Sequence, residues 1–293
     1  MSPILALIIA NIVWGAGLPI YKNALHSISP FTLAFLRFFF ASLIFLPFAL
    51  KYKTSLISRR DWVEISLGSF FAIFINIAFL FFGLEKASSI SGGVFAASQP
   101  IFFVLLSVIL LKEKLNKKVL HGVLIALFGI SLIIFAPLLK GGDHGHTTTL
   151  LGDFFYFIST MGAVIGPLIW KKPLSKINTA VVTYYSFFFS AILFFPFMVF
   201  EWQKTPLHLT TANSLGIVYG VLGSSSLAYF LFNYGISKLS TQEVGIYSYL
   251  NPIGAMMIAI PLLHEYPDIY FLLGSVLVFF GIYISEKHKK KFR

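Results

Sequence analysis

The sequence predicts an all-α polytopic membrane protein, with ten transmembrane helices arranged as two inverted five-helix repeats around a central cavity. Composition is the first observation behind this fold class. Of 293 residues, 57% are hydrophobic and 11% are charged, whereas ordinary soluble domains have roughly 25% charged residues. The second observation is a series of apolar runs of roughly 20 residues, each long enough to cross a bilayer. The third is an internal repeat of these runs in the two halves of the chain.

The apolar runs follow one another with short polar segments between them. They are apolar on every face, as membrane helices are, and lack the alternating polarity of barrel strands. The first run has no basic leader and no small-residue cleavage site, so we interpret it as a retained helix and not as a signal peptide. In chain order, the predicted spans are 3–21, 30–50, 62–84, 89–111, 119–139, 150–170, 179–200, 212–236, 243–263 and 270–285.

Basic side chains are divided unevenly between the loops. The loops after the second, fourth, sixth and eighth spans and the C-terminal tail KHKKKFR carry most of them, while the opposite loops carry Lys22, Lys86, Lys140 and Lys204. The positive-inside rule therefore predicts a multi-pass protein of the plasma (inner) membrane with both termini in the cytoplasm. This sorting explains the net charge of +11 better than nucleic-acid binding does, so we expect no nucleic-acid partner. The tail is also expected to contact anionic lipid.

Residues 1–149 and 150–293 are predicted to be two copies of one unit. The stretches FAASQPIFFVLLSVILLKE and YSYLNPIGAMMIAIPLLHE both carry an amide before a proline, and a glutamate thirteen residues after that proline. Because each copy has five spans, the second copy enters the membrane from the opposite side, and inverted repeats of this kind are typical of alternating-access transporters. The matched residues include Gly17, Lys22, Gly83, Lys86, Gly93, Pro100, Glu113 and Gly122, which recur in order as Gly166, Lys171, Gly235, Lys238, Gly245, Pro252, Glu265 and Gly274.

The sequence offers little for catalysis or metal binding. It contains no cysteine, which excludes disulfides, thiol nucleophiles and thiolate metal sites. His144 and His146 lie with Asp143 in the loop GGDHGHTTT, where three candidate ligands on one glycine-rich loop favour a connector over a metal site. No cluster of Asp, Glu or His lies deep in the spans, which argues against a membrane-embedded enzyme. We therefore expect no metal and no cofactor.

Several segments resemble the EamA-type, ten-helix branch of the drug/metabolite transporter superfamily. They are NIVWGAGLPIYK, SPFTLAFLRFFFAS, the stretch from GLEKASSISGG to FGISLI, and GISKLSTQEVGIYSYLNPIGAMMIAIPLLHE, so the resemblance covers nearly the whole chain. It implies a cavity lined chiefly by spans 1, 3, 4, 6, 8 and 9, and export or exchange of small metabolites such as amino acids. The chain departs from the family pattern at Asn251, where many members carry an acid, and at Ser186, which stands where the first half has Arg37.

Candidate substrate-binding residues are polar or aromatic side chains on the predicted lining helices. Gln99 and Asn251 precede the matched prolines, and we favour cavity lining over interhelical hydrogen bonding for this symmetric pair. In the first span Asn11, Trp14, Gly15 and Leu18 share one helical face, although a Trp beside a Gly is also typical of helix packing. The further candidates are Thr160, which matches Asn11 in the repeat, and Asn76, Tyr156, Tyr229, Asn233 and Tyr247.

Hinge or gate functions are predicted for the matched prolines and glutamates. Pro100 and Pro252 each free a backbone carbonyl in mid-membrane, which indicates either a hinge or a tolerated kink. Glu113 and Glu265 end spans 4 and 9, where they either latch a gate by pairing with basic neighbours or mark the start of solvent. Arg37 is a charge inside span 2 that either pairs with a substrate carboxylate or has a structural role, snorkelling to the outer interface or capping backbone carbonyls, and we favour the structural alternative.

The leading hypothesis is a secondary transporter, whether exporter, exchanger or facilitator, for small organic molecules such as amino acids. A flippase for lipid-linked carriers is the alternative within the same fold, and a laterally open groove would favour it. A membrane-embedded enzyme is the third hypothesis. The expected partners are a small-molecule substrate and the bilayer, and the small-residue pattern from Gly122 to Ala126 would permit a homodimer as well as a monomer.

Overall fold

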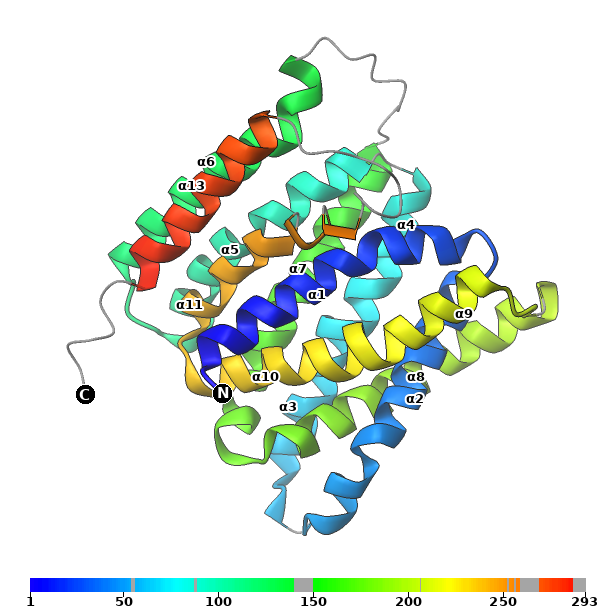
Figure 1. Ribbon diagram of the computed structural model, residues 1–293. Coiled ribbons are helices and arrows are strands. Elements are labelled where there is room, and N and C mark those ends of the chain that lie inside the picture. Colours follow the sequence, from blue (N-terminus) through cyan, green and yellow to red (C-terminus); the bar gives the residue numbers. More distant parts are fainter. Residues whose placement is uncertain are drawn as a thin grey trace.

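The fold is a bundle of long helices, seen in a computed structural model that describes residues 1–53, 56–86, 89–139, 150–205, 207–251, 253–255, 257–258 and 269–286. Within these ranges the regular elements are all helical (Figure 1). The first half contains α1 (Pro3–Leu25), α2 (Pro30–Lys51), α3 (Arg59–Ser69), η2 (Phe70–Ile75), α4 (Asn76–Lys86), α5 (Ser89–Leu111) and α6 (Lys117–Leu139). The second half contains α7 (Leu150–Lys176), α8 (Thr179–Lys204), α9 (Thr211–Val218), η3 (Tyr219–Tyr229), α10 (Phe230–Lys238), α11 (Thr241–Gly245), η4 (Ile246–Leu250) and α13 (Ile269–Glu286).

Each predicted span corresponds to one helix or to a run of consecutive helices in the described part of the chain. Span 3 is α3, η2 and α4; span 8 is α9, η3 and α10; and span 9 begins as α11 and η4. Five of the described helices, at Pro30–Lys51, Arg59–Gly83, Leu151–Lys176, Thr179–Lys204 and Thr211–Lys238, are long and apolar enough to cross a membrane. Several helices are longer than the predicted spans. α7, for example, continues beyond the apolar stretch through polar residues to Lys176.

Local signals in the sequence fix several helix starts. Pro3 and Pro30 open α1 and α2, where a missing N–H costs no helical hydrogen bond. Reciprocal capping boxes open three further helices: Ser58 with Asp61 at α3, Thr210 with Asn213 at α9, and Ser240 with Glu243 at α11.

The first helices of the two halves run in opposite directions. The Tyr234 hydroxyl in α10 donates to the carbonyl of Met1, at the start of α1, over 3.1 Å. The Lys171 ammonium, near the end of α7, donates to the carbonyls of Ile236, over 2.6 Å, and of Leu239. The start of α1 and the end of α7 therefore both lie at the C-terminal end of α10. We call this side, marked by Met1, Lys171 and Leu239, the N-terminal face.

The two halves meet through helices that are equivalent in the repeat. α2 packs along α8, and α6 packs along α13 (Figure 1). At the second contact Gly122 and Gly281 face each other, and a Cβ on either glycine would lie within 2.5 Å of the other's carbonyl oxygen. The small-residue pattern from Gly122 to Ala126, which by sequence alone would permit dimerisation, is thus used to pack α13 within the same chain.

Two π-helical segments lie at matched positions in the middle of spans 3 and 8. η2 and η3 interrupt these spans, and in the repeat the equivalents of 70–75 are 222–227, within η3. π-helical turns are rare and concentrate at functional sites, because they leave backbone and side chains out of the ordinary helical register. The interruption in both halves therefore indicates that the candidate functional site lies at the centres of these two helices.

Candidate functional site

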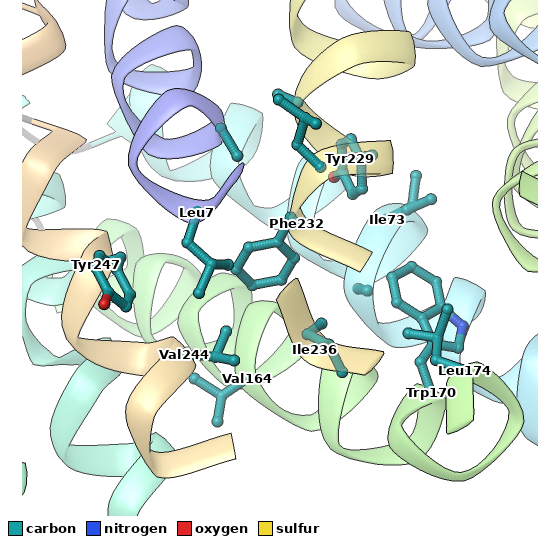
Figure 2. Packing of buried hydrophobic residues seen from close by; sticks show 14 of the residues in the cluster. Leu7, Ile73, Val164, Trp170, Leu174, Tyr229, Phe232, Ile236, Val244 and Tyr247 are labelled. Atoms are coloured by element: carbon teal, nitrogen blue, oxygen red, sulfur yellow. The ribbon is translucent and has the colours of Figure 1, made fainter. Parts of the chain in front are cut away.

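The indole of Trp14 on α1 binds directly to the π-helical segment η3. Its Nε1–H donates to the carbonyl of Ser224 over 2.9 Å. The ring packs edge-on against Tyr229, with centroids 5.0 Å apart, and against Phe232 at 4.9 Å. Trp14 remains half-buried. Tyr229 is buried in the apolar cluster shown in Figure 2. Two of the predicted residues, Trp14 and Tyr229, are therefore brought together, and they form the aromatic part of the candidate site.

Ser224 also accepts a hydrogen bond from Arg37, through its hydroxyl. Arg37 on α2 donates from Nη2 to the Ser224 hydroxyl over 2.9 Å. Its alkyl chain crosses Gly220, where an added Cβ would lie 2.5 Å from Cγ of Arg37. Arg37 is only 3% exposed, so its side chain is buried in the helix contact. The glycine allows the side chain to turn into the helix contact instead of following α2 outward.

Directly after the other π-helical segment, η2, Asn76 forms reciprocal hydrogen bonds with Ser159, which connect span 3 to α7. The Asn76 amide donates to the carbonyl and the hydroxyl of Ser159 over 3.1 and 3.0 Å, and the Ser159 hydroxyl donates to the carbonyl of Asn76 over 2.8 Å. The hydrogen-bond donor of the Asn76 side chain is thus already used in a contact between helices. Thr160, next to Ser159, is buried, and the hydroxyl of the buried Tyr156 has no hydrogen-bond partner among the described residues.

Asn251 lies against α1. Its repeat equivalent Gln99 lies on α5 and is half-buried. The backbone of Asn251 passes so close to Gly15 that a Cβ there would lie 1.9 Å from the Asn251 carbonyl oxygen. The side-chain oxygen of Asn251 is buried without a partner in the described part of the protein. The structure therefore places Asn251 next to the Trp14 helix and leaves its amide oxygen available.

The remaining predicted binding residues contact other parts of the helix bundle. Asn11 donates to Leu7 of its own helix over 2.8 Å, and the buried Asn233 donates to the Thr183 hydroxyl over 3.0 Å. Tyr247 is fully buried in the apolar cluster of Figure 2. The stripe predicted on α1 is consequently divided: Asn11 serves the helix itself, Trp14 contacts η3, and Gly15 contacts Asn251.

The two proline positions differ. The α-helix α5 continues through Pro100, which is buried, so this proline is accommodated without a break. Pro252 lies outside the described residues, but the segment just before it, Ile246–Leu250, is a 3₁₀-helix. The matched segment of the first half, 94–98, is α-helical within α5. The copies thus share the proline but not the local helix type.

Glu113 bridges the two halves at the N-terminal face. From the end of α5 its carboxylate accepts from the Thr241 N–H over 3.2 Å, from the Thr241 hydroxyl over 2.8 Å and from the Gln242 amide over 3.4 Å. It thereby caps the start of α11 in the other repeat, and Lys171 lies within electrostatic reach of it. Its equivalent Glu265 lies outside the described residues, as do the loop containing His144 and His146 and the tail from residue 287.

The centre of the bundle is filled on this face. Leu7, Val164, Ile236 and Val244, from four different helices, are fully buried, and Figure 2 shows their side chains converging. A Cβ on Gly235 would lie 2.4 Å from the Leu7 side chain. The structure is therefore closed between α1, α7, α10 and α11 on the N-terminal face. The central cavity remains a prediction for another state or another depth of the bundle.

The sequence interpretation missed the serines of η3. Ser224, Ser225 and Ser226 are buried, and the hydroxyls of Ser225 and Ser226 have no hydrogen-bond partner among the described residues. A run of three serines between glycine and leucine in the middle of an apolar span was the available signal, because polar groups inside a membrane are expensive and mark functional positions. Ser159, the partner of Asn76, was missed for the same reason.

This arrangement defines the class of the protein as a multi-pass helical membrane protein with two related halves. The chain belongs to the EamA-like transporter family, whose sequence profile matches residues 1–135 and 150–286. A solved crystal structure has the same fold, with a TM-score of 0.82 over 98% of this chain and 96% of that one, at 18% sequence identity.

Curated relatives carry transporter names. An uncharacterized transporter of Bacillus subtilis is 24% identical over 99% of this chain and 88% of its own length. A protein of Rickettsia bellii named as an S-adenosylmethionine uptake transporter is 28% identical over 91% of this chain and 87% of its own. A protein of Escherichia coli named as a probable amino-acid metabolite efflux pump is 25% identical over 96% and 93%. The family and these relatives are named as transporters.

Proposed function

We propose that the protein is a secondary transporter that moves small organic metabolites such as amino acids across the plasma membrane by alternating access. In this proposal residues 1–149 and 150–293 are the two inverted repeats, and the N-terminal face, with both termini, is cytoplasmic. The basic loops support this orientation, because the segments that contain Lys112, Lys114 and Lys176 lie at this face and the cytoplasmic side of membrane proteins is enriched in Lys and Arg.

The observation that carries the proposal is the relation between the two halves. Their first helices run in opposite directions, they meet through equivalent helices, and their third helices are interrupted by π-helical segments at matched positions. Two halves of this kind can exchange conformations, so that a site between them opens first to one side and then to the other. The closed N-terminal face then represents one end of the cycle.

The substrate is proposed to bind between α1, η3 and the break of span 9. Trp14 offers an aromatic surface that is half-buried, and the Asn251 amide oxygen and the η3 hydroxyls offer polar groups that lack partners in the described structure. Gln99 is assigned to the equivalent position in the first half. The site has amides, hydroxyls and aromatic rings and takes a small solute that is partly polar and partly apolar.

Transport by purified protein in liposomes, over a panel of amino acids, amines, nucleosides and sugars, tests this function. We expect at least one solute to be transported, and we expect Asn251→Ala and Gln99→Ala to lower its rate by about tenfold, as a lost pair of buried hydrogen bonds would. Phe128→Ala is the matched control, because Phe128 is 62% exposed on the outside of the bundle. Unchanged transport in both amide variants would remove them from the site, and a panel without any transported solute would contradict the function.

A flippase for lipid-linked carriers is the second candidate, and one observation favours it. A groove of about 520 Å³ opens on the outer surface along the seam between α2 and the run α9 to η3. Its lining is entirely apolar, which suits an acyl or isoprenoid chain: Phe40, Leu43, Ile44, Ile217, Val218, Val221 and Leu222.

Filling the groove distinguishes the two candidates. Leu222 is 56% exposed there, so Leu222→Trp adds bulk in the groove itself. We expect this variant to transport the panel solutes at the wild-type rate, because the proposed binding site lies on the other side of η3. Loss of translocation of a lipid-linked sugar, with no soluble solute transported by the wild type, would favour the flippase.

A further inference from the structure

Arg37 is a buried cation without an acidic partner. It is 3% exposed inside the membrane-spanning helix α2. Among the residues that the structure describes, its guanidinium donates to the Ser224 hydroxyl and lies over the rings of Tyr21 and Phe38, whose centroids are 4.5 and 5.3 Å from the guanidinium carbon. A charge in this position is costly, and in membrane helices such charges serve substrate or ion pathways or are neutralised by a partner. No carboxylate in the described part of the chain neutralises this one.

The donors around Arg37 are not all used. Its Nε–H is buried and has no acceptor among the described groups, and the buried hydroxyls of Ser225 and Ser226, which follow Ser224 in η3, have no partner there either. A guanidinium is a donor only, and a hydroxyl can donate. A group that accepts several hydrogen bonds and carries a negative charge is therefore missing from this place. A carboxylate matches the planar fork of a guanidinium, which binds it through two parallel hydrogen bonds.

Ser224 connects this cation to the aromatic part of the candidate site. The hydroxyl of Ser224 accepts from Arg37, and the carbonyl of the same residue accepts from Trp14. Arg37 and Trp14, which packs against Tyr229, thus bind the same residue of η3, where the helix is already out of α-helical register. A change in η3 that releases Ser224 from Arg37 frees a guanidinium next to an aromatic surface.

We propose that Arg37 binds the carboxylate of the transported solute, and that the solute is an amphipathic monocarboxylate such as an amino acid with an apolar or aromatic side chain. This inference rests on the proposed transport function. The carboxylate replaces the Ser224 hydroxyl as the acceptor for Arg37, and the apolar body lies against Trp14 and Tyr229. In the second half the equivalent of Arg37 is Ser186, which donates to Val182 of its own helix over 2.8 Å. The carboxylate site therefore exists in one half alone.

The test compares three probes with the same ring: L-phenylalanine, L-phenylalaninamide and phenethylamine. Wild-type protein in liposomes is expected to transport phenylalanine at least about tenfold faster than the two probes without a carboxylate. Arg37→Gln is expected to lower phenylalanine transport by about tenfold or more, the loss typical of a hydrogen bond to a charged group, and to leave the other two within about twofold of the wild type. Ser186→Ala, the matched control, keeps the wild-type preference.

Three results would overturn the carboxylate-binding role of Arg37. Equal losses for all three probes in a folded Arg37→Gln protein would make Arg37 a purely structural residue. If Arg37→Gln does not fold, Arg37→Lys keeps the charge without the fork, and its preference for phenylalanine over the amide should fall by about threefold or more. An unchanged preference in that variant overturns the inference. Transport of amines or sugars without any transport of phenylalanine overturns it too, while leaving the transport function intact.

Discussion

Replacing Glu113 by alanine is expected to open the N-terminal face. The carboxylate of Glu113 accepts hydrogen bonds from the backbone and hydroxyl of Thr241 and from the Gln242 amide, and these bonds tie the end of α5 to the start of α11 in the other repeat. A single hydrogen bond to a charged group contributes about 1.5 to 3 kcal/mol. The loss of these bonds leaves the first turn of α11, a helix of five residues, tied to the first half of the chain only through the bonds of Gln242 to Asn116 and Lys114 and through its buried side chains.

The opening can be measured with one cysteine, because the chain has none of its own. Val244 lies in α11 and is fully buried, so Val244→Cys reacts with a water-soluble maleimide only when the face opens. If Glu113→Ala lowers the free energy of opening by about 2 kcal/mol, the labelling rate should rise about 30-fold, since 1.4 kcal/mol corresponds to a factor of ten. Glu113→Gln, which keeps the shape and loses the charge, is expected to give a smaller increase.

Glu64→Ala is the matched control for the loss of a glutamate. Glu64 pairs with Arg60 over 2.9 Å on the surface of one helix, and the Arg60 side chain is 72% exposed. Exposed pairs of this kind contribute at most about 0.5 kcal/mol, so the labelling rate should stay near that of the parent. An equal rate in the Glu113→Ala and Glu64→Ala proteins would show that Glu113 does not hold this face closed.

The course of the chain through the membrane was predictable because the bilayer imposes it. A run of roughly 20 apolar residues has no other stable form in hydrocarbon than a helix, and the repeat of Gly, Pro, Lys and Glu residues indicated a second set of five. The glutamates show the limit of this reasoning. The sequence placed Glu113 at the end of a span and suggested a latch with basic neighbours, whereas the principal partners are Thr241 and Gln242, 128 and 129 residues away.

The candidate site was less predictable than the fold because it depends on the rotation of each helix. A helix that is apolar on every face does not reveal which side meets a neighbour, and so Asn11 and Trp14, on one stripe, have different partners. The π-helical segments add to this difficulty, since they shift every following side chain around the helix. The partners of Arg37 were not predictable for a local reason: no residue of its own helix indicates that Gly220, on another helix, leaves room for the Arg37 side chain.

Replacing Gly15 by alanine is expected to destabilise the protein more than the same replacement at any other glycine named here. A Cβ at Gly15 would lie 1.9 Å from the carbonyl oxygen and 2.7 Å from the carbonyl carbon of Asn251. At the same crossing a Cβ on Gly254 would lie 2.3 Å from the carbonyl oxygen of Ile12. The obstacles are backbone atoms, which cannot turn aside as a side chain can. The two segments must separate, and we expect a loss of about 3 kcal/mol, the upper end for overpacking.

Gly223→Ala is the control that adds the same methyl group in another membrane-spanning segment. Its Cβ would lie 3.4 to 3.6 Å from ring atoms of Tyr219, which is ordinary contact distance. Thermal unfolding of the purified proteins should show a lower midpoint for Gly15→Ala and a midpoint close to the wild type for Gly223→Ala. Transport should fall along with stability in the first variant, since separation of α1 from Asn251 moves two parts of the candidate site apart. Matching midpoints in the two variants would mean that α1 and span 9 do not cross in backbone contact.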